Sequence, residues 1–290
     1  MIDSPQIKIA IASGKGGTGK TLVSTNLFYT LQQQSHRLTL VDCDAEEPND
    51  LVFLKGNLLS VAEVTQKVPV IDESKCTFCG KCHDYCAYNA IFLLPPAKII
   101  QVIEDLCHGC GACSVACEFD AVSEKNVSLG SVSQYSIGDE ALTIEARMKV
   151  GVFSPVNVIK AAIKKAGNEG IVIMDAPPGT SCPFIHTVAK ADFVILVTEP
   201  TPFGLSDLKQ SIETLKTMSK KYGVIINRAG MGDQGVYEYL KEERIPLLME
   251  IPFDKSIAMH YSKGEIFASV NTKFQEKLLM MFNSIVEKWN

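Results

Sequence analysis

Two groups of residues in this sequence could carry out chemistry, and the first is a glycine-rich stretch that ends in a lysine and a threonine. Residues 13–21 read Ser-Gly-Lys-Gly-Gly-Thr-Gly-Lys-Thr and contain the pattern G-x-x-x-x-G-K-[ST]. The glycines let successive backbone N–H groups point into one concavity that binds phosphate oxygens. Lys20 would reach the β- and γ-phosphates, and the hydroxyl of Thr21 would ligate Mg²⁺. The stretch predicts a nucleotide-phosphate site, with a glycine-rich turn that binds no ligand as the alternative. The residues predicted to bind the nucleotide here are Gly14, Lys15, Gly16, Gly17, Thr18, Gly19, Lys20 and Thr21.

The second group consists of eight cysteines in two runs of identical spacing, C-x₂-C-x₂-C-x₃-C. Each cysteine of the second run lies 31 residues after its counterpart in the first, so a short unit is duplicated. Thiolates at this spacing ligate [4Fe–4S] clusters, and the fourth cysteine of each run ligates the other cluster. Two zinc sites are the alternative, although zinc more often uses separate C-x₂-C pairs. The predicted ligand sets are Cys76, Cys79, Cys82 and Cys117 for one cluster, and Cys107, Cys110, Cys113 and Cys86 for the other.

Three aspartates follow apolar runs that read as β-strands. The apolar runs are residues 7–12, 37–41 and 170–174. The first leads into the glycine-rich stretch, the second into Asp42-Cys43-Asp44, and the third into Asp175. Because the carboxyl ends of parallel strands meet at one edge of a sheet, these carboxylates should lie beside the phosphate site. Asp175 then corresponds to the Walker-B position that holds the Mg²⁺ shell, and Gly179 would bring a backbone N–H to the γ-phosphate. The alternative is that Asp42 or Asp44 only caps the segment that follows.

The remaining chain alternates short apolar runs with helix-like segments. The strands are expected at residues 193–198, 223–226 and 247–250, and the helices at 204–218, 235–243 and 274–289. This alternation predicts an α/β fold with a doubly wound, mostly parallel sheet. Residues 132–148 read as a β-hairpin around Gly138-Asp139, whereas residues 49–71 show no clear pattern. We therefore expect a discontinuous nucleotide-binding domain, residues 1–71 and 126–290, with a small α+β cysteine-rich domain, residues 72–125, inserted into it.

Composition and net charge limit the kinds of partner and the cellular compartment that we expect for this protein. The chain has 290 residues and a net charge of −5, which argues against non-specific nucleic-acid binding. The residues from Met1 to Pro5 do not resemble a signal peptide, and no apolar run reaches the length of a transmembrane helix. A cytoplasmic protein is expected, in which the ten cysteines ligate metal or clusters rather than form disulfides.

The form K-G-G-T-G-K-T, with Lys15 after the first glycine, resembles the MinD/ParA/nitrogenase iron protein superfamily of P-loop ATPases. The resemblance implies that the protein hydrolyses ATP as a homodimer and that Lys15 touches the nucleotide of the partner. It assigns Asp44 to positioning the attacking water, Asp42 to the Mg²⁺ environment and Asn227 to the adenine edge. The predicted catalytic residues are Lys15, Lys20 and Asp44. A solvated loop lysine and ordinary turn chemistry at the end of a strand are the alternatives.

With the cysteine repeat, the chain resembles MinD-superfamily ATPases that contain an inserted ferredoxin domain. The function expected from this resemblance is a nucleotide-gated homodimer that couples ATP hydrolysis to electron transfer through two [4Fe–4S] clusters to a redox partner. An iron–sulfur cluster assembly or carrier ATPase, which delivers to an acceptor protein, is the alternative. A positioning ATPase of the ParA or MinD type, with the clusters as sensor or structural element, is the second.

Two further features bear on these alternatives. Cys182 lies seven residues after Asp175. This offset resembles that between the switch aspartate and the cluster-bridging cysteine of the nitrogenase iron protein. That family needs two such cysteines in each subunit and a second is missing here, so we expect Cys182 to be a semi-buried thiol without a ligand role. The C-terminal helix carries glutamate and lysine on its polar face, so it is expected to pack on the sheet and not on a membrane.

Overall fold

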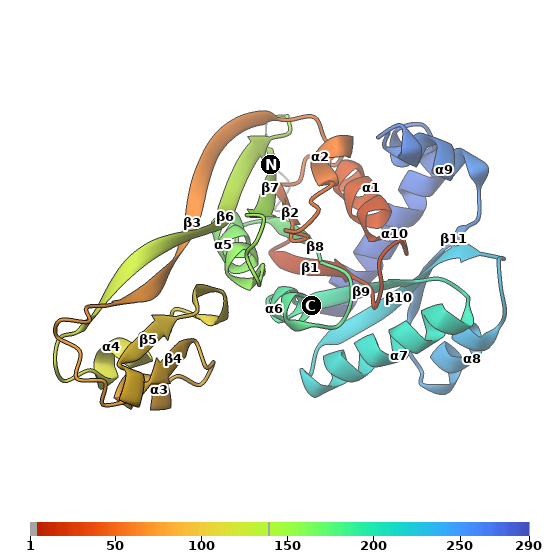
Figure 1. Cartoon of the computed structure of the whole chain (residues 1–290). Helices are drawn as coiled ribbons and strands as arrows, with labels where there is room; N and C mark the ends of the chain where they lie inside the picture. Colours follow the sequence, from red (N-terminus) through yellow and green to blue (C-terminus); the bar gives the residue numbers. More distant parts are fainter. Residues whose placement is uncertain (1–4, 139, 290) are drawn as a thin grey trace. The chain divides into compact units, whose positions relative to one another are not determined.

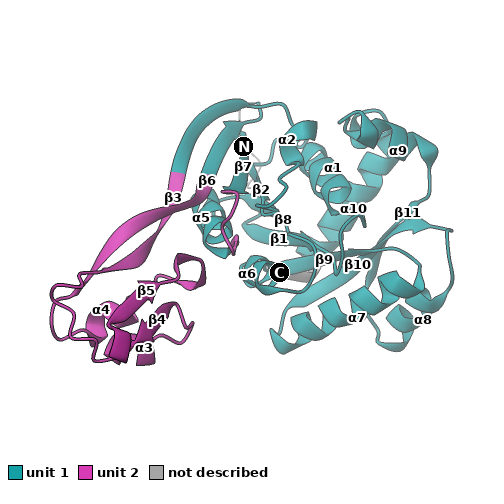
Figure 2. Ribbon diagram, in the orientation of Figure 1, with its two compact units in different colours: residues 1–62, 132–147, 156–290 teal, residues 63–131, 148–155 magenta. Residues whose placement is uncertain are grey.

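Two units, each formed from separate segments of chain, make up the described residues 5–138 and 140–289 of this computed structural model (Figures 1 and 2). The first unit takes residues 1–62, 132–147 and 156–290, and the second takes residues 63–131 and 148–155. The predicted insert, residues 72–125, falls within the second unit, which extends beyond it on both sides. Met1 to Ser4 and Asp139, on which the expectations about a signal peptide and a hairpin turn partly rest, lie outside the described residues.

A nine-stranded sheet has the order β11-β10-β9-β1-β8-β2-β7-β6-β3. All neighbours from β11 to β7 pair in parallel, which confirms the expectation of an α/β fold with a mostly parallel sheet. Only four residues separate β6 from β7, too few for a crossover, so these strands form the predicted hairpin. The strands are β1 (Ile7–Ala12), β2 (Leu38–Asp42), β3 (Asn57–Ile71), β6 (Val122–Ser136), β7 (Ala141–Met148), β8 (Ile171–Asp175), β9 (Phe193–Thr198), β10 (Lys221–Ala229) and β11 (Leu247–Pro252).

Helices of the first unit follow the predicted alternation. They are α1 (Lys20–Gln32), α2 (Asp50–Phe53), α5 (Val156–Ala166), α6 (Cys182–Val188), α7 (Pro202–Thr217), α8 (Gly235–Glu242), α9 (Lys255–Ser262) and α10 (Thr272–Trp289). The apolar face of α10, which includes Phe274, Leu278 and Phe282, is buried in the same core as Ile9 of β1. The expectation that this helix packs on the protein is therefore confirmed, although the side chain of Trp289 lies outside the described residues. Among the described helices, none is both long and apolar enough to cross a membrane.

The segment 49–71, which showed no clear pattern, forms α2 and the fifteen-residue strand β3. β3 is an edge strand, and Leu58, Leu59 and Val61 are all exposed. Because no face of the strand is continuously buried here, the sequence lacks the alternation of apolar and polar residues by which a half-buried strand is recognised.

The second unit repeats one backbone conformation. Its remaining elements are α3 (Lys81–Asp84), β4 (Ile91–Leu94), β5 (Ile99–Val102) and α4 (Ala112–Ala116), with short 3₁₀ turns at Pro95–Ala97 and Glu104–Leu106. The starts of α3 and α4 lie 31 residues apart, as do those of β4 and β6. Three residues of the first repeat have left-handed backbone, and so do their three counterparts 31 residues later. These residues are Phe78, Gly80 and Asn89 in the first repeat and Gly109, Gly111 and Asp120 in the second. The duplication in the sequence is thus a duplication of chain path.

Candidate functional site

The glycine-rich stretch forms the loop between β1 and α1, at the carboxyl edge of the parallel sheet. Gly17 and Gly19 have φ of 76° and 100°, values that residues with a Cβ adopt only with strain. Lys20, the first residue of α1, is 7% exposed, and burial lowers the pKa of its ammonium although Asp175 and Asp44 raise it. A buried cation that its neighbours compensate only partly is suited to bind an anionic phosphate.

The loop after β8 joins this loop directly. The hydroxyl of Thr21 donates a hydrogen bond of 2.7 Å to Asp175, and the backbone N–H of Gly179 donates one of 3.1 Å to the carbonyl of Ser13. Burial raises the pKa of Asp175 to about 6, against the opposing effects of Lys20 and Thr21. Residues predicted from separate segments are therefore brought together at one edge of the sheet.

Asp42, at the end of β2, is 2% exposed and uses both of its carboxylate oxygens within the chain. It accepts hydrogen bonds from the backbone N–H groups of Asp44, Asn49 and Asp50, at 3.1, 2.8 and 3.0 Å. Burial and the nearby Asp175 nevertheless raise its pKa well above the usual range. These bonds shape the segment after β2, as the capping alternative expects, and the Mg²⁺ role of Asp42 stays a prediction.

Asp44 follows β2 and is partly buried near the phosphate loop. Burial raises the pKa of its carboxyl, whereas Lys20 and the backbone N–H of Glu47 lower it. Its closeness to Lys20 is compatible with the expected position beside the terminal phosphate, and its role in positioning water stays a prediction.

Lys15 lies within an ion-pair group that was not foreseen. Its ammonium is 3.6 Å from Glu199, and the guanidinium of Arg228 is 2.6 Å from the same carboxylate. Glu199 is 8% exposed and directly follows β9, the parallel neighbour of β1. Glu199 could have been predicted from the sequence, because an apolar strand that ends in Glu-Pro places this carboxylate at the same sheet edge as the aspartates.

Asn227 of β10 is 7% exposed, and its amide donates a hydrogen bond of 2.8 Å to the carbonyl of Thr18. It lies so close to Gly19 that a Cβ at this position would collide with its side-chain nitrogen. Asn227 therefore touches the phosphate loop, and its role at the adenine edge stays a prediction.

Asp50 is a residue that sequence reasoning missed. It begins α2, is fully buried, and neither of its carboxylate oxygens has a hydrogen-bond partner among the described residues. Burial and the charges of Asp42 and Asp175 raise its pKa well above the usual range. Asp50 lies in the segment that showed no pattern, so nothing local to it pointed to the site.

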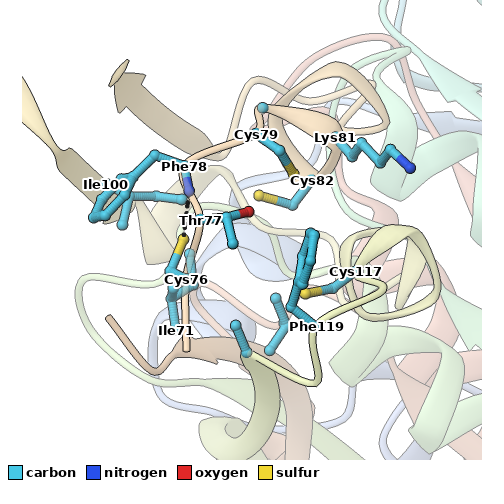
Figure 3. Close-up of a pocket in the computed structure, with 13 residues that line it drawn as sticks. Ile71, Cys76, Thr77, Phe78, Cys79, Lys81, Cys82, Ile100, Cys117 and Phe119 are labelled. Atoms are coloured by element: carbon cyan, nitrogen blue, oxygen red, sulfur yellow. Dashed lines mark hydrogen bonds between the residues drawn. The ribbon is translucent and has the colours of Figure 1, made fainter. Parts of the chain in front are cut away.

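The eight cysteines of the repeats line two pockets of the second unit. One pocket is lined by Cys76, Cys79, Cys82 and Cys117, as Figure 3 shows, together with apolar residues such as Phe78 and Ile100. The other is lined by Cys86, Cys107, Cys110 and Cys113, together with Tyr88 and His108, whose rings stack at 3.8 Å. These are the two ligand sets predicted for clusters, each drawn from both repeats. Binding of iron by them stays a prediction.

Backbone N–H groups point at several of these sulfurs. Phe78 donates to Cys76 at 3.4 Å, and Ala90 donates to Cys86 at 3.2 Å. In the part of the chain that the structure describes, no three histidine, cysteine or carboxylate side chains gather closely enough to hold a single metal ion. A [4Fe–4S] cluster requires its four thiolates to lie farther apart than the ligands of a single ion, because each iron binds one thiolate at a separate corner of the cluster.

Cys182 is exposed at the start of α6, which corrects the expectation of a semi-buried thiol. Cys43, between Asp42 and Asp44, is by contrast fully buried.

Comparison with known proteins now decides the family. The model of the CobQ/CobB/MinD/ParA nucleotide binding domain matches residues 9–267. The chain belongs to this family. It is thus a nucleotide-binding member of the MinD/ParA group of P-loop ATPases, whose members bind and hydrolyse ATP.

Several known proteins are similar over most of the chain. The uncharacterized protein MJ0579 of Methanocaldococcus jannaschii is 34% identical, and the match covers 92% of this chain and 94% of that protein. An iron–sulfur cluster carrier protein of Methanococcus maripaludis is 23% identical, over 97% of this chain and 84% of the relative. Among solved structures, the septum site-determining protein MinD of Pyrococcus horikoshii, complexed with Mg-ADP, has a TM-score of 0.59 at 19% identity, with 98% of each chain covered. At this identity the structural likeness shows the shared MinD fold.

Proposed function

We propose that this MinD/ParA-family protein hydrolyses Mg²⁺-ATP as a nucleotide-gated homodimer and couples hydrolysis to electron transfer through two [4Fe–4S] clusters. The observation that carries the proposal is the convergence of the eight cysteines into two pockets of four, each with three cysteines from one repeat and the fourth from the other. That exchange of the fourth ligand is typical of two-cluster ferredoxins.

The donor sets fit the proposed clusters. Each pocket gathers four cysteine sulfurs, which are the soft ligands that iron–sulfur clusters require, with backbone N–H groups directed at sulfur. Bound clusters would supply one-electron transfer. The chain's own residues supply the ligands, the apolar surroundings and the N–H groups that stabilise negative charge on the sulfurs.

The nucleotide half of the proposal rests on the residues around the phosphate loop. Lys20, Thr21 and Asp175 supply the charge and the Mg²⁺ environment that phosphoryl transfer requires. Lys15 is only partly buried in its pair with Glu199, so it can exchange this partner for the nucleotide of a second subunit. Phe203 in the first turn of α7 is 79% exposed, and its neighbour Gly204 lines the same hollow as Lys15. An exposed aromatic residue beside the nucleotide site supports a dimer that forms over this edge.

Connectivity gives the two units a physical link. β3 and β6 each contribute residues to both units without a break in the strand. The two units are therefore joined by two unbroken strands.

A cluster carrier is the second candidate. Relatives named iron–sulfur cluster carrier proteins match most of this chain, and Cys79 and Cys110 are exposed, as exchange with an acceptor protein requires. A positioning ATPase of the ParA or MinD type has the fold likeness in its favour and would use the cysteine pockets only as a sensor or structural element.

The test starts with anaerobic reconstitution and analysis of iron. The wild type should hold about eight irons per chain, and Cys117→Ser should lose roughly half of them, since only one ligand set is broken. Cys182→Ser, which removes an exposed thiol outside both pockets, is the matched control and should keep the full content. Equal iron loss in both variants would contradict the assignment of ligands.

Electron paramagnetic resonance then separates the two functions. For electron transfer, we expect clusters that stay bound, change their reduction or spectrum with ATP, and pass electrons to an oxidised acceptor protein. Transfer of iron to an apo-ferredoxin at the expense of the protein's own signal would refute electron transfer in favour of the carrier. Spectra and transfer that do not respond to ATP would refute nucleotide gating.

A further inference from the structure

Asp50 presents a chemical problem that the predicted Mg²⁺ ligands do not explain. Its side chain is fully buried, and both of its carboxylate oxygens lack a hydrogen-bond donor among the described residues. It interacts closely with the carboxyl of Asp175, whose Oδ1 is also buried and without a donor. Two buried carboxylates that face each other need a cation or a shared proton between them.

The surrounding groups do not supply that compensation. Asp42 faces the same space, but its oxygens are already engaged by three backbone N–H groups. Lys20 is the cation that acts on Asp175 and Asp44. Thr21 donates its hydroxyl proton to the other oxygen of Asp175. The uncompensated charge is thus concentrated where Thr21, Asp175 and Asp50 meet.

The fold holds Asp50 at this place from two sides. Its own backbone N–H donates to Asp42, which anchors the start of α2 to the end of β2. At the other end of α2, the ring of Phe53 packs on Tyr261 of α9 at 4.8 Å, and the hydroxyl of Tyr261 approaches Thr21. Because α2 is anchored at both ends, the carboxyl of Asp50 stays buried although its desolvation is unfavourable.

We propose that Asp50 is a positioning residue of the Mg²⁺ site, whose carboxylate accepts hydrogen bonds from the water molecules of a Mg²⁺ bound at Thr21. Mg²⁺ keeps several waters in proteins and binds through one or two carboxylates plus substrate phosphates, so outer acceptors are needed to orient those waters. The orphaned oxygens of Asp50 and Asp175 are such acceptors. The inference rests on the proposed nucleotide site and is independent of the cysteine pockets.

The test uses Asp50→Asn in the full chain, with Mn²⁺ and ADP as probes and electron paramagnetic resonance of Mn²⁺ as the readout of binding. Loss of an outer-shell partner should weaken Mn²⁺ binding in the presence of ADP by about 10- to 100-fold. In the absence of metal and nucleotide, the same variant should melt within roughly 2–4 °C of the wild type, because asparagine keeps the size of the buried side chain. Cation affinity should therefore fall without a matching loss of stability.

Two controls separate this role from a structural one. Asp42→Asn should lower the melting temperature, because it disturbs the acceptor of three backbone N–H groups. Glu46→Gln removes an exposed carboxylate from the same segment and should change neither quantity. Asp50→Ser, which leaves room for water, provides a second neutral variant should the asparagine variant not fold, and it should weaken Mn²⁺ binding in the same way.

The outcomes are distinct. Wild-type Mn²⁺ affinity in a folded, neutral variant would mean that Asp50 merely shares a proton with Asp175, and it would overturn the proposal. A wild-type protein that binds no ADP would overturn this proposal together with the nucleotide site, whatever the iron content. Weakened Mn²⁺ binding in a protein that lacks iron would support the role of Asp50 while refuting the cluster proposal.

Discussion

Asp175 should make the stability of the metal-free protein fall as the pH rises. Its carboxyl is 3% exposed, and burial raises its pKa from 3.8 to about 6. An acid with a higher pKa in the folded than in the unfolded state binds more protons when folded. The stabilisation is therefore fully present below pH 3.8 and is lost as the pH rises through about 6.

The size of this effect follows from the change in pKa. Each pKa unit is worth about 1.4 kcal/mol, so ionisation of Asp175 costs the folded state about 3 kcal/mol at neutral pH. For a unit of this size, that corresponds to roughly 6–12 °C in melting temperature. Because Asp175 is buried, solvent screening does not diminish the effect. Asp42 and Asp50, whose pKa values burial also raises, act in the same direction.

The assay is calorimetry of the wild type and of Asp175→Asn at one scan rate, without nucleotide or Mg²⁺, from about pH 4.5 to 7.5. The melting temperature of the variant minus that of the wild type should increase by roughly 4–8 °C over this interval, since only the wild type acquires the buried charge. This is about two-thirds of the full effect, because at pH 4.5 the pH already exceeds the unfolded pKa of 3.8 and part of the cost is present. Glu46→Gln should show no such trend, and Mg-ADP should reduce the trend in the wild type by compensating the charge. A difference between Asp175→Asn and wild type that is independent of pH would refute the reasoning.

Three further predictions concern the phosphate loop and the cysteine unit. Lys15→Ala should leave the melting temperature almost unchanged, because a partly exposed ion pair with Glu199 contributes less than about 1 kcal/mol. The variant should lose ATP turnover, measured by phosphate release, but keep ADP binding, measured by calorimetric titration. Asn227→Ala should weaken ADP binding about tenfold, since the carbonyl of Thr18 loses its buried donor and the loop loosens, and unchanged affinity would contradict this. Gly109→Ala should lower the iron content at the second cysteine pocket, because φ is 63° and a Cβ would lie 2.6 Å from Gln66. Gly111→Ala, whose Cβ would make only an ordinary contact of 3.6 Å with Glu124, should cost about 1–2 kcal/mol of backbone strain and keep its iron.

The nucleotide site could be predicted from the sequence because the residues that form the phosphate loop are contiguous in the chain. A strand, a glycine-rich loop and a helix follow one another within residues 7–32, and the backbone path that binds phosphate is dictated by glycines at fixed spacing. Asp175 could be placed as well, since an apolar run that ends in a carboxylate has one preferred position in a parallel sheet. The strand β3 could not, because an edge strand buries too little of either face to leave a periodic pattern.

What the sequence by itself determined is therefore local: the phosphate loop, the spacing of the cysteines and the strands that end in aspartate. Tertiary structure alone decided how three buried carboxylates divide their tasks. Among the residues that the structure describes, Asp42 accepts hydrogen bonds from three backbone N–H groups, Asp175 accepts one from Thr21, and the carboxyl of Asp50 accepts none. It also brought Glu199 to Lys15 from a strand far away in the chain. Hydrogen-bond partners and desolvation depend on which surfaces the folded chain brings together, and a pattern along the chain carries no record of that.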